Sequence, residues 1–217
     1  MTNQRSLLIK QYSILQDYES TFAAMKQFTE SRTPNDPDQL WLLQHYDVLT
    51  QGQAGKPEHI LTPLSDLPVV QTDRGGQVTW HGKGQLVAYL MFDLNRLKWH
   101  VRDLVNFTEQ LLIDLLKHYG LNAYAKKDAP GVYINEQKIA SLGFKIRKGC
   151  SYHGLSLNID CSLAGFSTIN PCGYAGLKMI RLIDVLQDAP NFDQLCAQII
   201  DLINQQQIFS SIKTRLD

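Results

Sequence analysis

All four cysteines of the chain lie in its last third, and the residues around Cys172 favour a reactive thiol. In the segment 169–176 (INPCGYAG), Pro171 fixes its own φ and Gly173 frees the backbone after the cysteine. We expect a helical pattern to begin at Leu177, so the thiol would stand near a helix N-terminus, where a thiolate is favoured. The thiolate is the nucleophilic form of cysteine. The alternative is a small buried cysteine that serves only packing.

A lysine at the start of an apolar run is the second candidate for chemistry. Lys138 opens the segment 138–144 (KIASLGF), which has the character of a strand. A lysine partly buried at the edge of such a strand loses hydration, which favours the neutral amine that can act as a base. The alternative is an exposed lysine at a strand edge, which is the commoner case. The segment alone does not decide between the two.

The glycine-rich segment 72–85 (TDRGGQVTWHGKGQ) combines a fixed cation, Arg74, with the donor and acceptor ring of His81. Its glycines let the backbone approach a ligand closely or adopt positive φ. The segment matches neither the dinucleotide fingerprint nor the phosphate loop, so no motif supports nucleotide binding. We interpret it as a loop between two strands that could bind a substrate. A purely structural glycine turn is the alternative.

A histidine, His153, lies in the strand-like segment 151–158 (SYHGLSLN). Alternation predicts that it shares a face with Leu155 and Leu157, and such a histidine is most often a core residue. Cys150 stands three residues earlier, at a spacing that zinc ligands also use. Residues three apart in a strand point to opposite faces, and no second close pair follows. We therefore expect no metal site.

Strand-like and helix-like patterns alternate along the chain without a low-complexity linker. Apolar residues at steps of three and four predict helices at 12–31, 101–119 and around 195–203. Apolar runs predict strands at 6–12, 40–46, 69–70, 86–94, 132–135, 138–146 and 153–159. The expected fold class is α/β (α+β), a mixed β-sheet packed with helices. We expect one domain, 1–217, whose last part, 177–217, is helical.

The composition is that of a globular protein and narrows the classes of function. Of 217 residues, 21 are Lys or Arg and 21 are Asp or Glu, so the formal charge is zero. A neutral balance argues against a dedicated nucleic-acid binder. No apolar run approaches the roughly 18 residues of a membrane span, and the N-terminal segment lacks the apolar core of a signal peptide. We expect a cytoplasmic protein with reduced thiols, and neither nucleic acid nor membrane as a partner.

Several segments together resemble one known family. The stretches RGGQVTWHGKGQLVAY, DAPGVY, QKIASLGFKIRKGCSYHGLSLNI and NPCGYAG stand in the order found in the lipoyl(octanoyl) transferases. The similarity runs from 40 to 183 and includes Lys138, His153 and Cys172. One departure is Lys83, which stands where that family usually has the proline of an H-G-P-G-Q loop. The change exchanges a fixed φ for a charge, and it bears on substrate affinity more than on the type of reaction.

The resemblance implies a catalytic domain like that of the biotin/lipoate protein ligases, and a reaction that moves an octanoyl group from octanoyl-acyl carrier protein to a lysine of a lipoyl domain. It makes Cys172 the acyl-thioester nucleophile, and Lys138 the residue that stabilises its thiolate and acts as acid and base. The implied acceptors are lipoyl domains of 2-oxoacid dehydrogenase E2 subunits and the glycine cleavage H protein. No cofactor is implied. The residues implied to bind substrate are Arg74, Gly75, Gly76, Gln77, Val78, Thr79, Trp80, His81, Ser141, Leu142, Gly143, His153, Gly154, Leu155 and Ser156.

Two physical arguments agree with this assignment. A thioester is already an activated acyl group, so amide formation needs no ATP, and the missing phosphate loop is expected. The stretch 126–148 has six basic residues and two acidic ones, which would steer an acidic carrier protein toward it. A charged stretch is more often only a solvated face, so the second argument is supporting.

Three other functions remain open on the sequence. An ATP-dependent lipoate-protein ligase would keep the lysine without needing the cysteine. A cysteine thioesterase or hydrolase would pass the acyl group to water instead of to an amine. A non-catalytic module that binds carrier proteins would need neither residue, and the joint presence of Lys138 and Cys172 argues against it.

Overall fold

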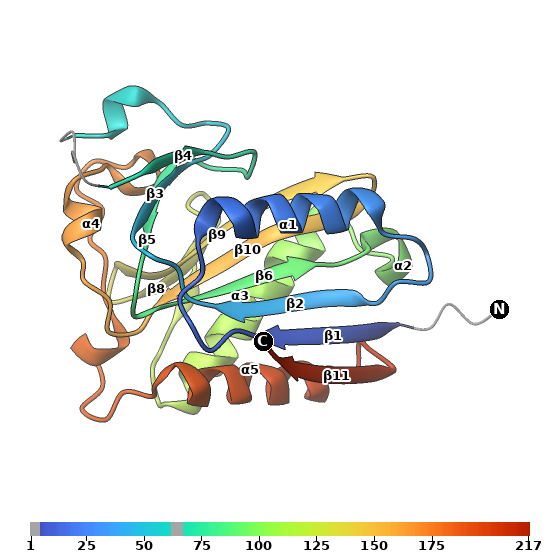
Figure 1. The fold of residues 1–217 in the computed structure, drawn as a ribbon. Coiled ribbons are helices and arrows are strands. Elements are labelled where there is room, and N and C mark those ends of the chain that lie inside the picture. The colour runs from blue at the N-terminus through green and yellow to red at the C-terminus, as the bar shows by residue number, and fades with distance from the viewer. Residues whose placement is uncertain (1–4, 62–66) are drawn as a thin grey trace.

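The computed structural model describes residues 5–61 and 67–217. Its centre is an eight-stranded mixed sheet in the order β11-β1-β2-β6-β10-β9-β8-β7 (Figure 1). The strands β11, β1 and β2 run parallel to one another, and the other neighbouring pairs are antiparallel. The strands of this sheet are β1 (Ser6–Gln11), β2 (Asp38–Leu43), β6 (Gln85–Met91), β7 (Tyr124–Ala125), β8 (Gly131–Ile134), β9 (Gln137–Arg147), β10 (Cys150–Asn158) and β11 (Ser211–Leu216).

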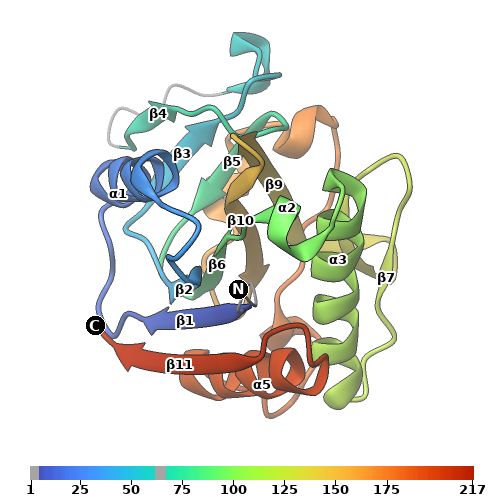
Figure 2. The same ribbon diagram turned by 90° about the vertical axis from the view of Figure 1, so that its right-hand side faces the viewer.

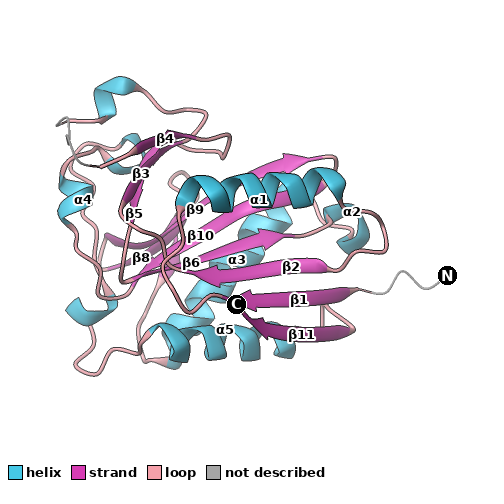
Figure 3. Ribbon diagram, in the orientation of Figure 1, coloured by secondary structure: helices cyan, strands magenta, loops and turns pink. Residues whose placement is uncertain are grey.

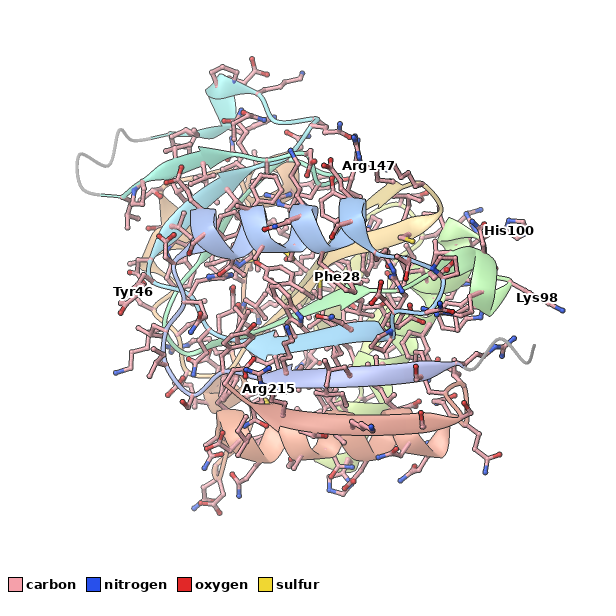
Figure 4. The ribbon with its side chains drawn as sticks, turned by 45° about the vertical axis from the view of Figure 1, so that its right-hand side comes forward. Phe28, Tyr46, Lys98, His100, Arg147 and Arg215 are labelled. Carbon is pink, nitrogen blue, oxygen red and sulfur yellow. The ribbon has the colours of Figure 1, made fainter. Side chains whose placement is uncertain are left out.

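Helices cover both faces of the large sheet, as Figure 2 shows. Apolar residues of α3 (Val101–His118) and α5 (Phe192–Gln205) form the larger core with one face. The other face packs against α1 (Tyr18–Ser31) through a smaller cluster around Met25. Phe28 of α1 lies against this cluster, whereas Tyr46 is exposed to solvent (Figure 4). The predicted mixed sheet with helices packed on it is therefore confirmed.

The helix ends follow from local chemistry. The side chain of Asp17 accepts a hydrogen bond from the backbone N–H of Ser20 and so caps α1. At the start of α3, the carboxylate of Asp103 accepts from the backbone N–H of His100 at 2.7 Å. The predicted helix at 101–119 is confirmed to within one residue, because its apolar stripe is long and regular.

A three-stranded sheet in the order β4-β3-β5 stands beside the large one (Figure 3). Its strands are β3 (Val48–Gln51), β4 (Val69–Gln71) and β5 (Val78–His81). The interpretation of 72–85 as one loop was wrong, since β5 lies within it and pairs antiparallel with β3. Four residues between two groups of glycines are too short a pattern to predict a strand. The remaining short helices are α2 (Leu94–Leu97), α4 (Ala164–Ser167) and the 3-10 turns η1 (Pro57–His59), η2 (Pro171–Gly173) and η3 (Leu182–Asp184).

The C-terminal part is only partly helical, which corrects the expectation for 177–217. No helix begins at Leu177, and the chain instead runs beside β9 before reaching α5. After α5 it forms β11, which pairs in parallel with β1 at the other end of the sequence. That pairing joins residues such as Ser6 and Ser211, so no local pattern could have predicted it. Within 5–61 and 67–217, no helix has both the length and the apolar character needed to cross a bilayer.

Candidate active site

The amine of Lys138 and the thiol of Cys172 are in contact. Nζ of Lys138 donates a hydrogen bond to Sγ of Cys172 at 3.1 Å and another to the carbonyl oxygen of Pro130 at 2.8 Å. Lys138 is 2% exposed, so the lysine is buried and not the exposed strand-edge residue that was the alternative. Gly131 leaves room for it, because a Cβ there would lie 2.4 Å from Cε of Lys138. The structure thus brings the two candidate residues together from segments 34 positions apart.

Cys172 stands on a left-handed turn. Its φ is 56° and that of Gly173 is 79°, and the backbone N–H of Gly173 donates to the carbonyl of Asn170 at 2.9 Å. No long helix follows, so the expected helix N-terminus does not contribute, and Lys138 is the cation beside the sulfur. The chain after the turn is tied to β9, since the N–H of Lys138 donates to the carbonyl of Lys178 at 2.9 Å. This connection holds the turn next to the lysine.

The other three thiols are buried, whereas Cys172 is partly exposed. Burial raises the pKa of Cys161 to about 12, and it also raises the pKa of Cys150 and of Cys196. A thiol that resists ionisation is a poor nucleophile. Geometry and burial therefore single out Cys172 among the four.

A cavity of about 430 Å³ opens beside this pair, and both Lys138 and Cys172 line it. Fourteen of the fifteen residues expected to bind substrate also line it. They are Arg74, Gly75, Gly76, Gln77, Val78, Thr79, His81, Ser141, Leu142, Gly143, His153, Gly154, Leu155 and Ser156. These fourteen residues come from β5, β9, β10 and the loop before β5.

Trp80 is the one residue of this expected set that does not line the cavity. It packs edge-on against Phe166 with 5.4 Å between ring centroids. Alternation along β5 turns Thr79 and His81 toward the cavity and Trp80 away from it. Gly165 makes room for the indole, since a Cβ there would lie 2.3 Å from Cδ1 of Trp80.

Several cavity residues come from segments that the sequence patterns did not single out. Tyr18 is a residue of the predicted helical stripe of α1, and nothing in that stripe separates a site residue from a core residue. Lys83, the departure from the family's loop, is exposed and does not line the cavity. The additional lining residues are Tyr18, Ala54, Val87, Tyr89, Val101, Val105, Ala129, Pro130, Phe144 and Tyr174.

Arg74 is buried, and its side chain forms hydrogen bonds with neighbouring segments of the protein. Its guanidinium donates to the carbonyl oxygen of Thr50 at 2.7 Å and to that of Gly75 at 3.0 Å. The backbone N–H of Gly75 in turn donates to the carbonyl of Phe144 at 2.8 Å. These bonds fix the loop before β5 against β3 and β9. Burial lowers the pKa of Arg74 below its ordinary value, although arginine remains charged in proteins.

His153 faces α1 and not the core shared by Leu155 and Leu157, which corrects the predicted alternation. Its φ of 61° breaks the strand pattern, and its ring lies 5.1 Å from that of Phe22. Nε2 of His153 donates to Asp73 at 2.9 Å. Burial alone would raise the pKa of Asp73, but hydrogen bonds from His153 and Tyr152 outweigh it and lower the pKa to about 2.

Two further histidines are held neutral by their surroundings. Burial lowers the pKa of His81 to about 3 and that of His45 to about 4. Nδ1 of His81 donates to Oε1 of Gln85, whose amide nitrogen donates to Asn158 at 2.9 Å. Because an amide oxygen can only accept, Nδ1 carries the proton of His81 and Nε2 is left as an acceptor. Among the described residues, no group of three or more His, Cys, Asp or Glu side chains could hold a metal ion.

The fold is that of lipoate and biotin protein ligases of known structure. A bi-partite lipoate protein ligase from Thermoplasma acidophilum matches with a TM-score of 0.74 at 15% identity, over 99% of this chain and 86% of that one. The biotin protein ligase from Aquifex aeolicus, in complex with biotin and ATP, matches with a TM-score of 0.56 at 9% identity, over 93% and 69%. At these identities the likeness concerns the fold alone.

The sequence comparisons define the family. Residues 17–204 match the lipoyl protein ligase A/B catalytic domain, and the chain belongs to this family. An octanoyltransferase from Acinetobacter baylyi is 62% identical over 97% of this chain and 96% of its own length. The resemblance to the lipoyl(octanoyl) transferases in the sequence is thereby confirmed.

Proposed function

We propose that the protein transfers an octanoyl group from octanoyl-acyl carrier protein to a lysine of a lipoyl domain, through an acyl thioester on Cys172. The observation that carries this proposal is the 3.1 Å hydrogen bond from Lys138 to Cys172 at the edge of the cavity. The relative that is 62% identical is named an octanoyltransferase, which supports octanoyl as the group transferred and acyl transfer as the class of reaction. The expected residues of the substrate site lie around the same cavity, apart from Trp80.

In the first half-reaction, Cys172 begins as a thiolate and Lys138 as an ammonium ion. The sulfur attacks the carbonyl carbon of the octanoyl thioester, a C–S bond forms, and the carbonyl oxygen takes the negative charge. When the intermediate collapses, the bond to the carrier's sulfur breaks, and that sulfur leaves with a proton from Lys138. The products are octanoyl-Cys172, the carrier thiol and a neutral lysine.

In the second half-reaction, the lysine amine of the lipoyl domain attacks the same carbonyl carbon. Lys138, now neutral, takes the proton that the attacking nitrogen loses as the amide forms. The thiolate of Cys172 leaves, and the starting ion pair is restored. Because the thioester supplies the driving force, neither ATP nor another cofactor enters either step.

The cavity suits a saturated acyl chain. Its volume of about 430 Å³ lies within the range of roughly 300–1,000 Å³ usual for small-molecule sites. Val87, Val105 and Leu155 present apolar surface to it. Each buried methylene stabilises a bound chain by about 0.8 kcal/mol, so a chain of several carbons would be held firmly.

The partners proposed are an acidic acyl carrier and the lipoyl domains of E2 subunits and the H protein. Of the basic residues in 126–148, Lys126 pairs with Glu136 and Arg147 pairs with Glu30. Within the described ranges, no acidic side chain pairs with Lys127, Lys145 or Lys148, which supports a positive surface for a carrier. A reduced Cys172 calls for a reducing compartment, which supports the cytoplasm as the location.

A transfer assay tests the proposal. Purified protein is mixed with octanoyl-acyl carrier protein and an apo lipoyl domain without ATP, and acylation of the lipoyl domain is followed by mass. We expect turnover by the wild type, a loss of about 10³-fold or more in Cys172→Ser, and wild-type turnover in Cys150→Ser. Transfer that requires ATP and survives Cys172→Ser would make the protein a ligase, and octanoate released in place of the acylated domain would make it a hydrolase.

A further inference from the structure

The side chain of Gln77 lines the cavity but makes no hydrogen bond within the described part of the chain. Its Oε1 is buried and has no partner there, and its Nε2, which also has no partner, is not among the buried atoms and so remains accessible as a donor. Buried amides are almost always paired, because leaving one unpaired costs free energy. An unpaired amide in a cavity is therefore a group that a bound molecule is expected to satisfy.

This amide lies against the residue that follows the nucleophile. A Cβ built on Gly173 would lie 2.1 Å from Nε2 and 2.5 Å from Oε1 of Gln77. Any side chain at 173 would therefore collide with the amide. The glycine serves both the left-handed turn and the close approach of Gln77 to the residue next to Cys172.

The backbone that carries Gln77 is fixed. Its carbonyl oxygen accepts from the N–H of Gly52 at 3.3 Å, and the carbonyl of Gly76 accepts from the N–H of Ala54 at 3.0 Å. A Cβ on Gly52 would lie 2.4 Å from that Gly76 oxygen, so the loop sits tightly on the end of β3. These backbone bonds fix the point from which the Gln77 side chain extends toward the turn, and a donor placed beforehand costs less reorganisation during a reaction.

The turn around Cys172 offers few other donors to an acyl oxygen. The N–H groups of Gly173 and Tyr174 are used by the carbonyls of Asn170 and Pro171. Nζ of Lys138 is bound to Sγ and to Pro130. The N–H of Cys172 has no acceptor among the described residues and can supply one hydrogen bond. Acyl transfer usually stabilises the developing oxyanion with two donors or more, so a second is needed.

We propose that Gln77 is a catalytic residue whose Nε2 donates a hydrogen bond to the carbonyl oxygen of the acyl group on Cys172. The bond strengthens as that oxygen becomes negative in the tetrahedral intermediate of each half-reaction. No covalent bond to Gln77 forms or breaks, and the amide gives up no proton. The inference rests on the proposed function, because it needs an acyl group at Cys172.

The test compares two reactions of the same thiol. Acylation of Cys172 by octanoyl-acyl carrier protein passes through an oxyanion, whereas alkylation by iodoacetamide is a direct displacement and does not. Gln77→Met removes the donor and keeps much of the volume, and Gln77→Ala removes the side chain beyond Cβ. Gln27→Met, on the exposed face of α1, is the matched control.

We expect both Gln77 variants to be acylated about 10²–10³-fold more slowly than the wild type, while their alkylation by iodoacetamide stays within about twofold. Gln27→Met should match the wild type in both reactions. If acylation and alkylation fall together, Gln77 only shapes the thiol's surroundings, and the inference is overturned. Unchanged acylation overturns it as well. A wild-type enzyme that takes up no octanoyl group would refute the proposed function itself, which is a separate outcome.

Discussion

Nζ of Lys138 lies 3.1 Å from Sγ of Cys172, with the lysine buried in β9 and the cysteine on a left-handed turn. The carbonyl of Pro130 holds the amine from another side, so the lysine is fixed by two acceptors. In the proposed mechanism, this contact is the path by which Lys138 exchanges a proton at the reacting sulfur.

Lys138→Met should abolish most transfer. The variant keeps an unbranched side chain but loses the group that carries the proton in both half-reactions, so we expect turnover to fall about 10²–10⁴-fold. Lys213→Met, exposed on β11 and not lining the cavity, is the control and should retain wild-type turnover. Steady-state rates with octanoyl-acyl carrier protein measure the effect, and a change of only a few-fold would exclude an acid–base role for Lys138.

Gly173→Ala should damage the site more than Gly176→Ala. Both glycines have φ near 80°, so each substitution carries the strain of a left-handed alanine, about 1 kcal/mol. Only at 173 does the new Cβ also meet another side chain, that of Gln77, whereas at 176 nothing lies within 4 Å. Turnover and thermal unfolding of the two variants measure the difference. Equal effects would mean that the contact with Gln77 carries no function.

Buried His45 should make the fold less stable as the pH falls. Burial lowers its folded-state pKa from 6.5 to about 4, so the unfolded chain binds the proton more readily. The stabilisation is present above pH 6.5 and is lost as the pH falls through about 4, by an amount on the order of 3 kcal/mol. Urea unfolding of the wild type and His45→Gln between pH 7.5 and 4 checks this, with His118→Gln on the exposed end of α3 as control. The His45→Gln variant should lose part of the pH dependence, and an unchanged slope would contradict the argument.

Asp73 should contribute to the pH dependence of the fold's stability in a more acidic range than His45. Its folded-state pKa of about 2 lies below the ordinary 3.8, so its stabilisation is present above pH 3.8 and is lost as the pH falls through about 2. Its side chain is 28% exposed, and solvent screening reduces the contribution to about 1–2 kcal/mol at neutral pH. Asp73→Asn should therefore be less stable than the wild type at pH 7 and nearly equal to it near pH 2. Denaturant curves at the two pH values would contradict this if the difference did not shrink.

Local sequence patterns predicted many of the helices and strands. The helix at 101–118 and the hairpin of β8 and β9 follow from sequence neighbours, and positive φ at Asn135 and Glu136 closes the hairpin. The order of the glycine, lysine and cysteine segments indicated the site, because it resembles the order found in the lipoyl(octanoyl) transferases.

The parts of the fold and the site that the sequence did not predict depend on contacts between residues far apart in the sequence. The pairing of β11 with β1 joins the two ends of the chain, and β5 is a strand only because β3 lies beside it. The left-handed backbone of His153 and Cys172 has no signature in the sequence, since neither is a glycine. Because 78–81 was not predicted to be a strand, nothing in the sequence indicated that Trp80 would turn away from the cavity while Thr79 turned toward it.

Intact mass of the enzyme tests the central claim most directly. The wild type is incubated with octanoyl-acyl carrier protein, digested to locate any adduct, and then chased with an apo lipoyl domain. The account predicts a gain of one octanoyl group on Cys172, and its disappearance as the lipoyl domain gains the same mass. If the lipoyl domain were acylated while Cys172 never carried the group, even in rapid quench, the acyl-enzyme mechanism would be wrong.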